Sequence, residues 1–255
     1  MLRANVWFDF PIKGDYHGFV RFSFLWLFAA LVLLPGCTYD TTSCDHLSPH
    51  ATRTVQKDVS RSDAKSSRTT ENLSQTHTRI TGKARCTAEQ MRKFLKQRHP
   101  KINNKYLLLP EIYISEGAKE GIRGDLAFAQ ALHETGFFKF GGDVLPQQNN
   151  FAGLGTTGKG VRGHSFATSQ LGVRAQIQHL KAYASTAPLN NPCVDPRFRY
   201  VKNRGCAPYI EDLGGKWAFP GYDTKKYASL EDALRHRDSY GDKIRKLCEE
   251  MEKVK

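Results

Sequence analysis

The stretch LAFAQALHETGFF, residues 126–138, is an apolar helical run that ends in a carboxylate, a glycine and two aromatic residues. Apolar side chains on nearly every face predict a helix buried at the centre of a domain. Glu134 stands near the C-terminal end of this helix, where the helix dipole and burial both disfavour an ionised carboxylate. The pKa of Glu134 is therefore expected to rise, as a general acid requires. The alternative is a surface role, in which Glu134 caps the helix or forms an ion pair with a neighbour such as Lys139.

Further helices are expected on both sides of this stretch. Residues 87–90, Thr-Ala-Glu-Gln, form a capping-box pattern that starts the first helix of the domain. A second helix is expected over residues 110–119, and Asp125 is the expected N-cap of the central helix. Apolar stripes predict two more, over residues 172–184 and 238–251. The glycine-rich segment after the central helix suits turns and a short hairpin, so the chain is mainly helical with a small β element.

The N-terminal part predicts export. Residues 22–34, FSFLWLFAALVLL, form an apolar run that is short for a spanning helix, which needs roughly 20 residues. The run leads into Leu-Pro-Gly-Cys, which resembles a bacterial lipobox ending at Cys37. We expect a membrane-anchored lipoprotein facing the cell wall, with simple secretion and an uncleaved anchor as alternatives. Residues 1–37 are then a signal peptide, 38–85 a disordered basic Ser/Thr-rich tether, and 86–255 the catalytic domain.

The charge of the chain favours polyanionic partners. Lys and Arg number 38 against 25 Asp and Glu, which gives a formal net charge of +13. Anionic lipid and anionic wall polymers fit this charge. The cations are spread over tether and domain without a nucleic-acid motif, so no specific nucleic-acid partner is expected. The sequence also has no His-Glu-x-x-His motif and no short paired cysteine spacing, so no metal site and no cofactor are predicted.

Six cysteines in an exported chain can form disulfides. Cys193 and Cys206 would close a short loop, and a bridge of that length contributes roughly 3 kcal/mol. Cys86 and Cys248 flank the predicted domain and would tie its ends together. Reduced thiols are the alternative for both pairs.

Two longer segments resemble a known family. Residues 134–155, ETGFFKFGGDVLPQQNNFAGLG, and 172–185, GVRAQIQHLKAYAS, are similar to the glucosaminidase domain of glycoside hydrolase family 73. The resemblance covers roughly residues 87–246, and that family contains bacterial peptidoglycan endo-β-N-acetylglucosaminidases. It implies an α+β lysozyme-like fold, in which a helical lobe and a small β-hairpin lobe flank the cleft. It also implies Glu134 as the catalytic residue and peptidoglycan glycan strands as the substrate.

Aromatic rings and side-chain amides follow Glu134, and such groups bind sugar faces and acetamido groups. Tyr227-Ala228-Ser229 resembles a family element that places a tyrosine in the cleft. The predicted substrate-binding residues are Phe137, Asp143, Gln148, Asn149, Asn150, Phe151 and Tyr227.

A second carboxylate is missing where some family members carry one. Residues 155–166, GTTGKGVRGHSF, contain no Asp or Glu, and Asp143 is the nearest alternative. Inversion, and retention through a protein nucleophile, both need a second carboxyl group. The resemblance therefore favours attack by the N-acetyl oxygen of the substrate, with Glu134 as acid and then base. A muramidase or lytic transglycosylase of the same fold, or a catalytically inactive wall-binding protein, are the alternatives.

Overall fold

The computed structural model describes residues 77–158 and 160–255. The predicted signal segment, the lipidation candidate Cys37 and most of the predicted tether lie outside these residues. Within the described part, no helix has both the length and the apolar character needed to cross a membrane.

The described chain is mainly helical, as predicted. Six α-helices and four short 3₁₀-helices follow one another along it. The α-helices are α2 (Ala88–Arg98), α3 (Leu109–Glu120), α4 (Gly124–Thr135), α5 (Ser169–Ala184), α6 (Leu230–Arg235) and α7 (Tyr240–Glu252). The 3₁₀-helices are η1 (Asn104–Leu108), η2 (Pro146–Gln148), η3 (Phe198–Tyr200) and η4 (Ile210–Leu213).

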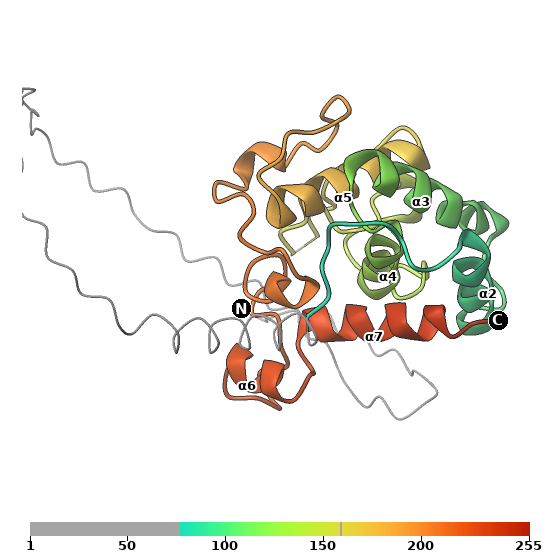
Figure 1. Cartoon of the computed structure of the whole chain (residues 1–255). Coiled ribbons are helices and arrows are strands. Elements are labelled where there is room, and N and C mark those ends of the chain that lie inside the picture. Colours follow the sequence, from blue (N-terminus) through green and yellow to red (C-terminus); the bar gives the residue numbers. More distant parts are fainter. Residues whose placement is uncertain (1–76, 159) are drawn as a thin grey trace, which may run out of the picture. The chain divides into compact units, whose positions relative to one another are not determined.

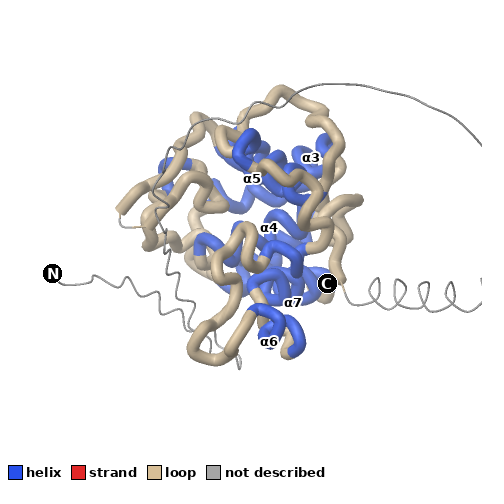
Figure 2. Tube along the Cα trace, turned by 90° about the vertical axis from the view of Figure 1, so that its left-hand side faces the viewer, coloured by secondary structure: helices blue, strands red, loops and turns tan. Residues whose placement is uncertain are grey.

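Helix α4 lies at the centre of this arrangement. Both views show it between the α3 and α5 pair and α7 (Figures 1 and 2). Every residue from Leu126 to Leu132 is buried, which confirms the prediction made from the apolar run. The last turn of α4 meets the first residue of α7 beside the core. The candidate site lies at this meeting point.

Local sequence signals explain most helix ends. Thr87 and Gln90 form the predicted capping box at the start of α2, with reciprocal hydrogen bonds of 2.9 and 3.2 Å. Gly121 ends α3 in the left-handed conformation, with φ of 71°. The predicted N-cap of α4 was wrong, because the helix already begins at Gly124. Asp125 lies in its first turn and is fully buried.

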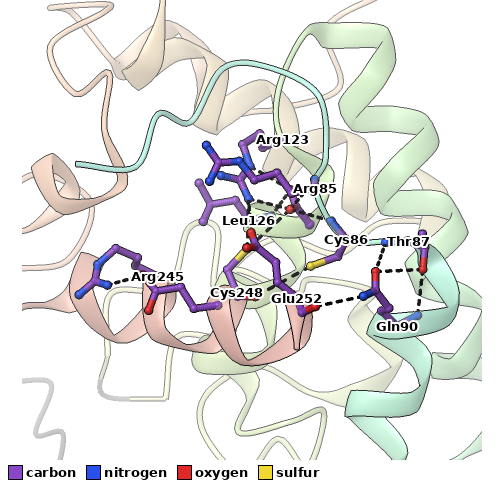
Figure 3. Close-up of polar contacts among 11 residues, drawn as sticks. Arg85, Cys86, Thr87, Gln90, Arg123, Leu126, Arg245, Cys248 and Glu252 are labelled. Atoms are coloured by element: carbon purple, nitrogen blue, oxygen red, sulfur yellow. Dashed lines mark hydrogen bonds and ion pairs between the residues drawn. The ribbon is translucent and has the colours of Figure 1, made fainter. Parts of the chain in front are cut away.

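The buried Asp125 carboxylate is paired with Arg123, which is buried as well. The Arg123 guanidinium donates to both Asp125 oxygens, at 3.2 and 2.7 Å, and the main-chain N–H of Arg85 donates to the same carboxylate at 2.8 Å. Arg123 also lies 3.3 Å from the Sγ of Cys248 and 3.5 Å from Glu252 (Figure 3). This cluster joins the start of α4 to the end of α7.

The four described cysteines are free thiols, so neither candidate disulfide is formed. Cys193 is exposed, and its Sγ faces the main-chain oxygen of Asp195 at 3.5 Å, whereas Cys206 packs against the core. Cys86 and Cys248 are buried neighbours, and the Sγ of Cys86 lies 3.9 Å from the Cys248 carbonyl oxygen.

The expected β-hairpin is absent from the described residues, in which only isolated β-bridges occur. Between η2 and α5 the chain instead forms successive turns, with one bridge from Gly158 to Val161. Main-chain bonds from Phe166 to Gln148 and from His164 to Leu154 close this loop. The glycines from 153 to 163 adopt positive φ, which favours turns over an extended ladder.

The predicted tether extends too far into the domain. Residues 77–85, assigned to the tether from their polar composition, lie against the folded part. Ile80 is fully buried, and its N–H and C=O bond to Pro208 and Arg123 at 3.0 and 2.9 Å. A single large apolar residue in a polar segment is a weak signal, which explains the misplaced boundary.

Candidate active site

Glu134 lies in the last turn of α4, which ends abruptly at Gly136. Gly136 has φ of 57°, and Phe137 and Phe138 also have positive φ, of 59° and 56°. Such conformations are costly for residues with a side chain and often occur near functional sites. Hydrogen bonds hold this turn, including Phe137 N–H to Leu132 O at 2.8 Å and Phe140 N–H to Thr135 O at 2.9 Å. The turn fixes the chain directly after the carboxylate.

Two side chains donate hydrogen bonds to one oxygen of Glu134. The indole Nε1 of Trp217 donates to Oε1 at 3.2 Å, and the hydroxyl of Tyr240 donates a short bond to the same atom. The predicted alternative, an ion pair with Lys139, does not form: in the described part of the chain, the contacts of the Glu134 carboxylate are with Trp217 and Tyr240. Glu134 is therefore held by neutral donors and has no cation beside it among these contacts.

The environment raises the pKa of Glu134 to about 7. Burial is the largest cause, while the hydrogen bonds from Tyr240 and Trp217 act in the opposite direction. Burial penalises the charged carboxylate, and donors to a carboxylate favour it. Glu134 therefore retains a proton over a large part of the neutral range, as a general acid must.

His133, next to Glu134 in sequence, is neutral at the same pH. Its ring meets that of Tyr240 edge-on at 5.4 Å, and burial, followed by the charge of Lys243, lowers the pKa of His133 to about 4. Tyr240 itself is buried, and its pKa is raised well above the usual value, first by burial and then by Glu134. Both neighbours are thus uncharged where Glu134 titrates.

Trp217 is placed by the turn that follows η4. The main-chain N–H of Trp217 donates to Leu213 O at 2.8 Å. The indole ring packs against His179 and Tyr183 on α5, with centroid distances of 4.8 and 5.8 Å. The Nδ1 of His179 lies 2.8 Å from the buried Asp195 carboxylate. These contacts orient the indole N–H toward Glu134.

The amide residues that were predicted to bind substrate form hydrogen bonds with the main chain of their own loop. Gln148 accepts from Leu145 N–H at 2.6 Å and donates to Arg162 O at 2.7 Å. Asn149 donates to Phe166 O, and Asn150 both donates to and accepts from Leu154. Their amide groups satisfy main-chain groups of the loop, which is a structural role.

The predicted aromatic residues are also largely structural. Phe151 is only 1% exposed and packs edge-on against Phe138, so its ring is not available to a sugar. Phe137 packs beside Phe94. Tyr227 is buried and donates to Asp238 at 2.9 Å, so it does not contact Glu134. Asp143, the predicted alternative carboxylate, accepts from Gly160 N–H at 3.1 Å.

The residues that do contact Glu134 carried weaker sequence signals. Both residues lie within residues 87–246, the span of the family resemblance: Tyr240 in the stretch Tyr-Gly-Asp-Lys-Ile and Trp217 in Gly-Lys-Trp-Ala. They lie 106 and 83 positions from Glu134. Sequence periodicity cannot predict a contact between residues so far apart in the chain. The family resemblance was the available signal for these two residues.

Replacing Tyr240 by phenylalanine should raise the pKa of Glu134, because a donor to the carboxylate is lost. The basic limb of the pH–rate profile should move upward by on the order of one pH unit. Tyr227→Phe removes a hydroxyl that bonds Asp238 instead, and should leave the limb in place. The measurement is glycan release against pH for both variants. A limb that moves in Tyr227→Phe and not in Tyr240→Phe would contradict the assignment.

One group of side chains in the described residues has the composition of a metal site. Cys86, Asp125, Cys248 and Glu252 offer ligand atoms within 4.8 Å of one another. Arg123 donates to Asp125, Cys248 and Glu252, so a guanidinium already supplies the positive charge among them. These residues do not fit a metal ion while Arg123 is in place.

Comparison with known proteins identifies the family. A sequence model named Glucosaminidase, described as mannosyl-glycoprotein endo-beta-N-acetylglucosaminidase, matches residues 110–253. The chain belongs to this glucosaminidase family. The match covers α4 to α7 and all of α3 except its first residue, and it therefore includes Glu134, Trp217 and Tyr240. The resemblance stated from the sequence is thus confirmed, and membership supports a glycosidase for a glycan of the peptidoglycan type.

A bacterial protein is similar to this chain. An uncharacterized protein of Borreliella burgdorferi is 41% identical over 153 residues, which span 59% of this chain and 74% of the relative. No solved structure matches the chain.

Proposed function

We propose that this protein hydrolyses the β-1,4 bond after N-acetylglucosamine in bacterial peptidoglycan, with Glu134 as general acid and base. The observation that carries the proposal is the carboxyl group of Glu134, which has a pKa of about 7 and two neutral donors on one oxygen. Family membership supplies the substrate class.

The proposed mechanism needs one protein carboxyl group. Protonated Glu134 gives its proton to the departing glycosidic oxygen while the N-acetyl oxygen of the substrate attacks the anomeric carbon. The C–O bond to the leaving sugar breaks and a cyclic oxazolinium forms. Glu134, now a carboxylate, takes a proton from a water molecule that attacks the same carbon and opens the ring. The net configuration is retained, as in other substrate-assisted glycosidases.

The absence of an acid in residues 155–166 supports this route. Asp143 is the nearest alternative, but its carboxylate accepts from the main chain of Gly160. A muramidase or lytic transglycosylase would use the same single glutamate at the other glycosidic bond. An inactive wall-binding protein would bind the same glycan, but a binding role alone does not require the raised pKa of Glu134.

Product analysis tests the proposal. Purified peptidoglycan is digested with the full chain, reduced with borohydride and hydrolysed, and the reduced sugar is identified by mass spectrometry. We expect reduced N-acetylglucosamine ends. Reduced muramic acid would indicate a muramidase, and anhydromuramic ends a lytic transglycosylase. Intact glycan with retained wall binding would indicate a binding protein.

We further propose that lipid at Cys37 anchors the protein to the membrane, facing the wall, where the excess of cations also attracts anionic wall polymers. The apolar run before the lipobox-like sequence supports this location. In detergent-phase partitioning of expressing cells, the natural protein should enter the detergent phase and Cys37→Ser the aqueous phase. Both proteins in the aqueous phase would indicate simple secretion, and both in the detergent phase an uncleaved anchor.

A further inference from the structure

A row of buried polar side chains leads from α3 through the core to Glu134. Tyr113 on α3, Gln176 on α5 and Gln130 on α4 are all fully buried, and Tyr240 on α7 is nearly so. Burying an amide or hydroxyl is costly unless it is hydrogen-bonded. Each of these groups is bonded to the next, so the row is a connected chain that ends at the carboxyl group.

A single main-chain carbonyl fixes the direction of this chain. The oxygen of Ala127 can only accept, so the Gln176 atom 2.9 Å from it is the amide nitrogen. The Oε1 of Gln176 then accepts from the Tyr113 hydroxyl at 2.6 Å. The second proton of the Gln176 nitrogen is donated to Gln130 Oε1 at 2.8 Å.

The same logic continues to the site. Because Gln130 Oε1 is the acceptor of that bond, its Nε2 faces Tyr240 and donates to the hydroxyl oxygen at 3.0 Å. A tyrosine hydroxyl that accepts in this way must turn its own proton elsewhere. That proton is donated to Glu134 Oε1. All bonds in the row therefore run in one direction, and aligned bonds strengthen one another.

The two oxygens of Glu134 are thereby made unequal. Oε1 receives protons from both Tyr240 and Trp217, whereas Oε2 has no hydrogen-bond partner among residues 77–158 and 160–255. An oxygen that already accepts two hydrogen bonds is a poor site for a third proton. Oε2 is left as the atom that can carry the proton to a leaving group.

We propose that Gln176 and Gln130 are positioning residues that, through Tyr240, confine the acidic proton of Glu134 to Oε2. Neither glutamine contacts Glu134, and both act through the direction of the Tyr240 hydroxyl. The catalytic meaning of this arrangement rests on the proposed function, because Oε2 is then the oxygen that protonates the glycosidic bond. The effect on proton binding does not depend on catalysis.

Few other titratable groups reach the carboxyl group. On α7 they are Tyr240 and, beyond it, Lys243, which lowers the pKa of His133 on α4. On the opposite side, Trp217 is backed by His179 and Tyr183 on α5, with Asp195 bonded to His179. A shift caused by a glutamine replacement can therefore be compared against a defined set of neighbours.

The test is a direct titration of Glu134 in Gln130→Met, which keeps the length of the side chain and removes both polar atoms. Protein labelled with ¹³C in glutamate side chains is titrated by NMR, and Glu134→Gln identifies the signal. We expect the midpoint to rise by about half a pH unit, because loss of one aligned bond weakens the next. Tyr240→Phe should raise it further, and Gln130→Met/Tyr240→Phe should equal Tyr240→Phe alone.

The matched control is Gln170→Met, the same change at a glutamine of α5 outside the row. Within the described chain, Gln170 donates to Glu116 at 2.8 Å and contacts neither the row nor the residues around Trp217, so its loss should leave the midpoint unchanged. An unchanged midpoint in folded Gln130→Met, or a shift in Gln130→Met that adds fully to that of Tyr240→Phe, would overturn the proposal. If Gln130→Met does not fold, Gln176→Met tests the previous bond by the same criteria.

The titration separates the two proposals. A shifted midpoint in a protein that cleaves no peptidoglycan would reject the proposed function and keep the inference about the proton. Cleavage with an unshifted midpoint would do the reverse.

Discussion

Glu134→Gln should reduce the release of soluble glycan from peptidoglycan by about 10²–10⁴-fold, the usual contribution of a general acid. Glutamine keeps an oxygen that can accept from Trp217 and Tyr240, so the fold and wall binding should persist. The proton that the leaving oxygen needs is lost. Release of dye-labelled fragments measures the effect, and co-sedimentation with intact walls measures binding.

The matched control is Asp143→Asn, the same change at the nearest alternative carboxylate. It should retain much of the activity. Asp143 accepts a hydrogen bond from the main-chain N–H of Gly160, and the side-chain oxygen of asparagine can accept the same bond. A loss as deep as that of Glu134→Gln would reject the single-carboxylate mechanism. Near-normal activity in Glu134→Gln would reject Glu134 as the acid.

Asp125→Ala should lower the free energy of unfolding by about 3–5 kcal/mol, because it leaves the Arg123 cation buried without its main partner. Arg123 is 4% exposed, and the N–H groups of Arg85 and Cys86 lose their acceptor as well. Urea unfolding measures the loss. Asp232→Ala breaks an exposed pair with Arg235 and should cost less than about 1 kcal/mol.

This stabilisation should depend on pH in a defined direction. The Arg123 guanidinium lowers the pKa of Asp125 in the folded protein against the opposing effect of burial. A lowered folded pKa stabilises the protein above the unfolded pKa, near 3.9, and the contribution is lost as the pH falls through the folded pKa. The difference in the free energy of unfolding between the natural protein and Asp125→Ala should therefore become smaller at acidic pH. A constant difference, or one below 1 kcal/mol at neutral pH, would contradict this account.

The central helix and its terminal carboxylate could be predicted because their signals are local. An apolar run without a polar face predicts burial, and Gly136 predicts the end of the helix. The raised pKa of Glu134 follows from burial, which the same apolar run predicts. The capping box at Thr87 is equally local, since its two bonds join residues three positions apart.

The partners of Glu134 could not be predicted in this way. Tyr227 was predicted to be the cleft tyrosine, but α6 separates it from Tyr240, and its hydroxyl bonds Asp238. Tyr240 reaches Glu134 because α7 packs along α4, which is a consequence of tertiary packing. The glutamines of the core row are likewise unremarkable in sequence, and their role depends on three helices meeting.

The loop after α4 shows a different limit. Its amides resembled a sugar-binding set, but a loop without strands must satisfy its main-chain groups by other means. Gln148, Asn149 and Asn150 do so. Composition alone does not distinguish an amide that awaits a ligand from one that holds its own loop.

The pH dependence of glycan cleavage by the natural protein tests the central claim most directly. We expect kcat/KM to fall as the pH rises through about 7, because Glu134 must hold a proton before the bond breaks. The fall should fit the titration of a single group. The residual activity of Glu134→Gln should not show this fall. Activity that already falls near pH 4–5, the range of an ordinary glutamate, or that persists undiminished well above pH 8, would contradict it.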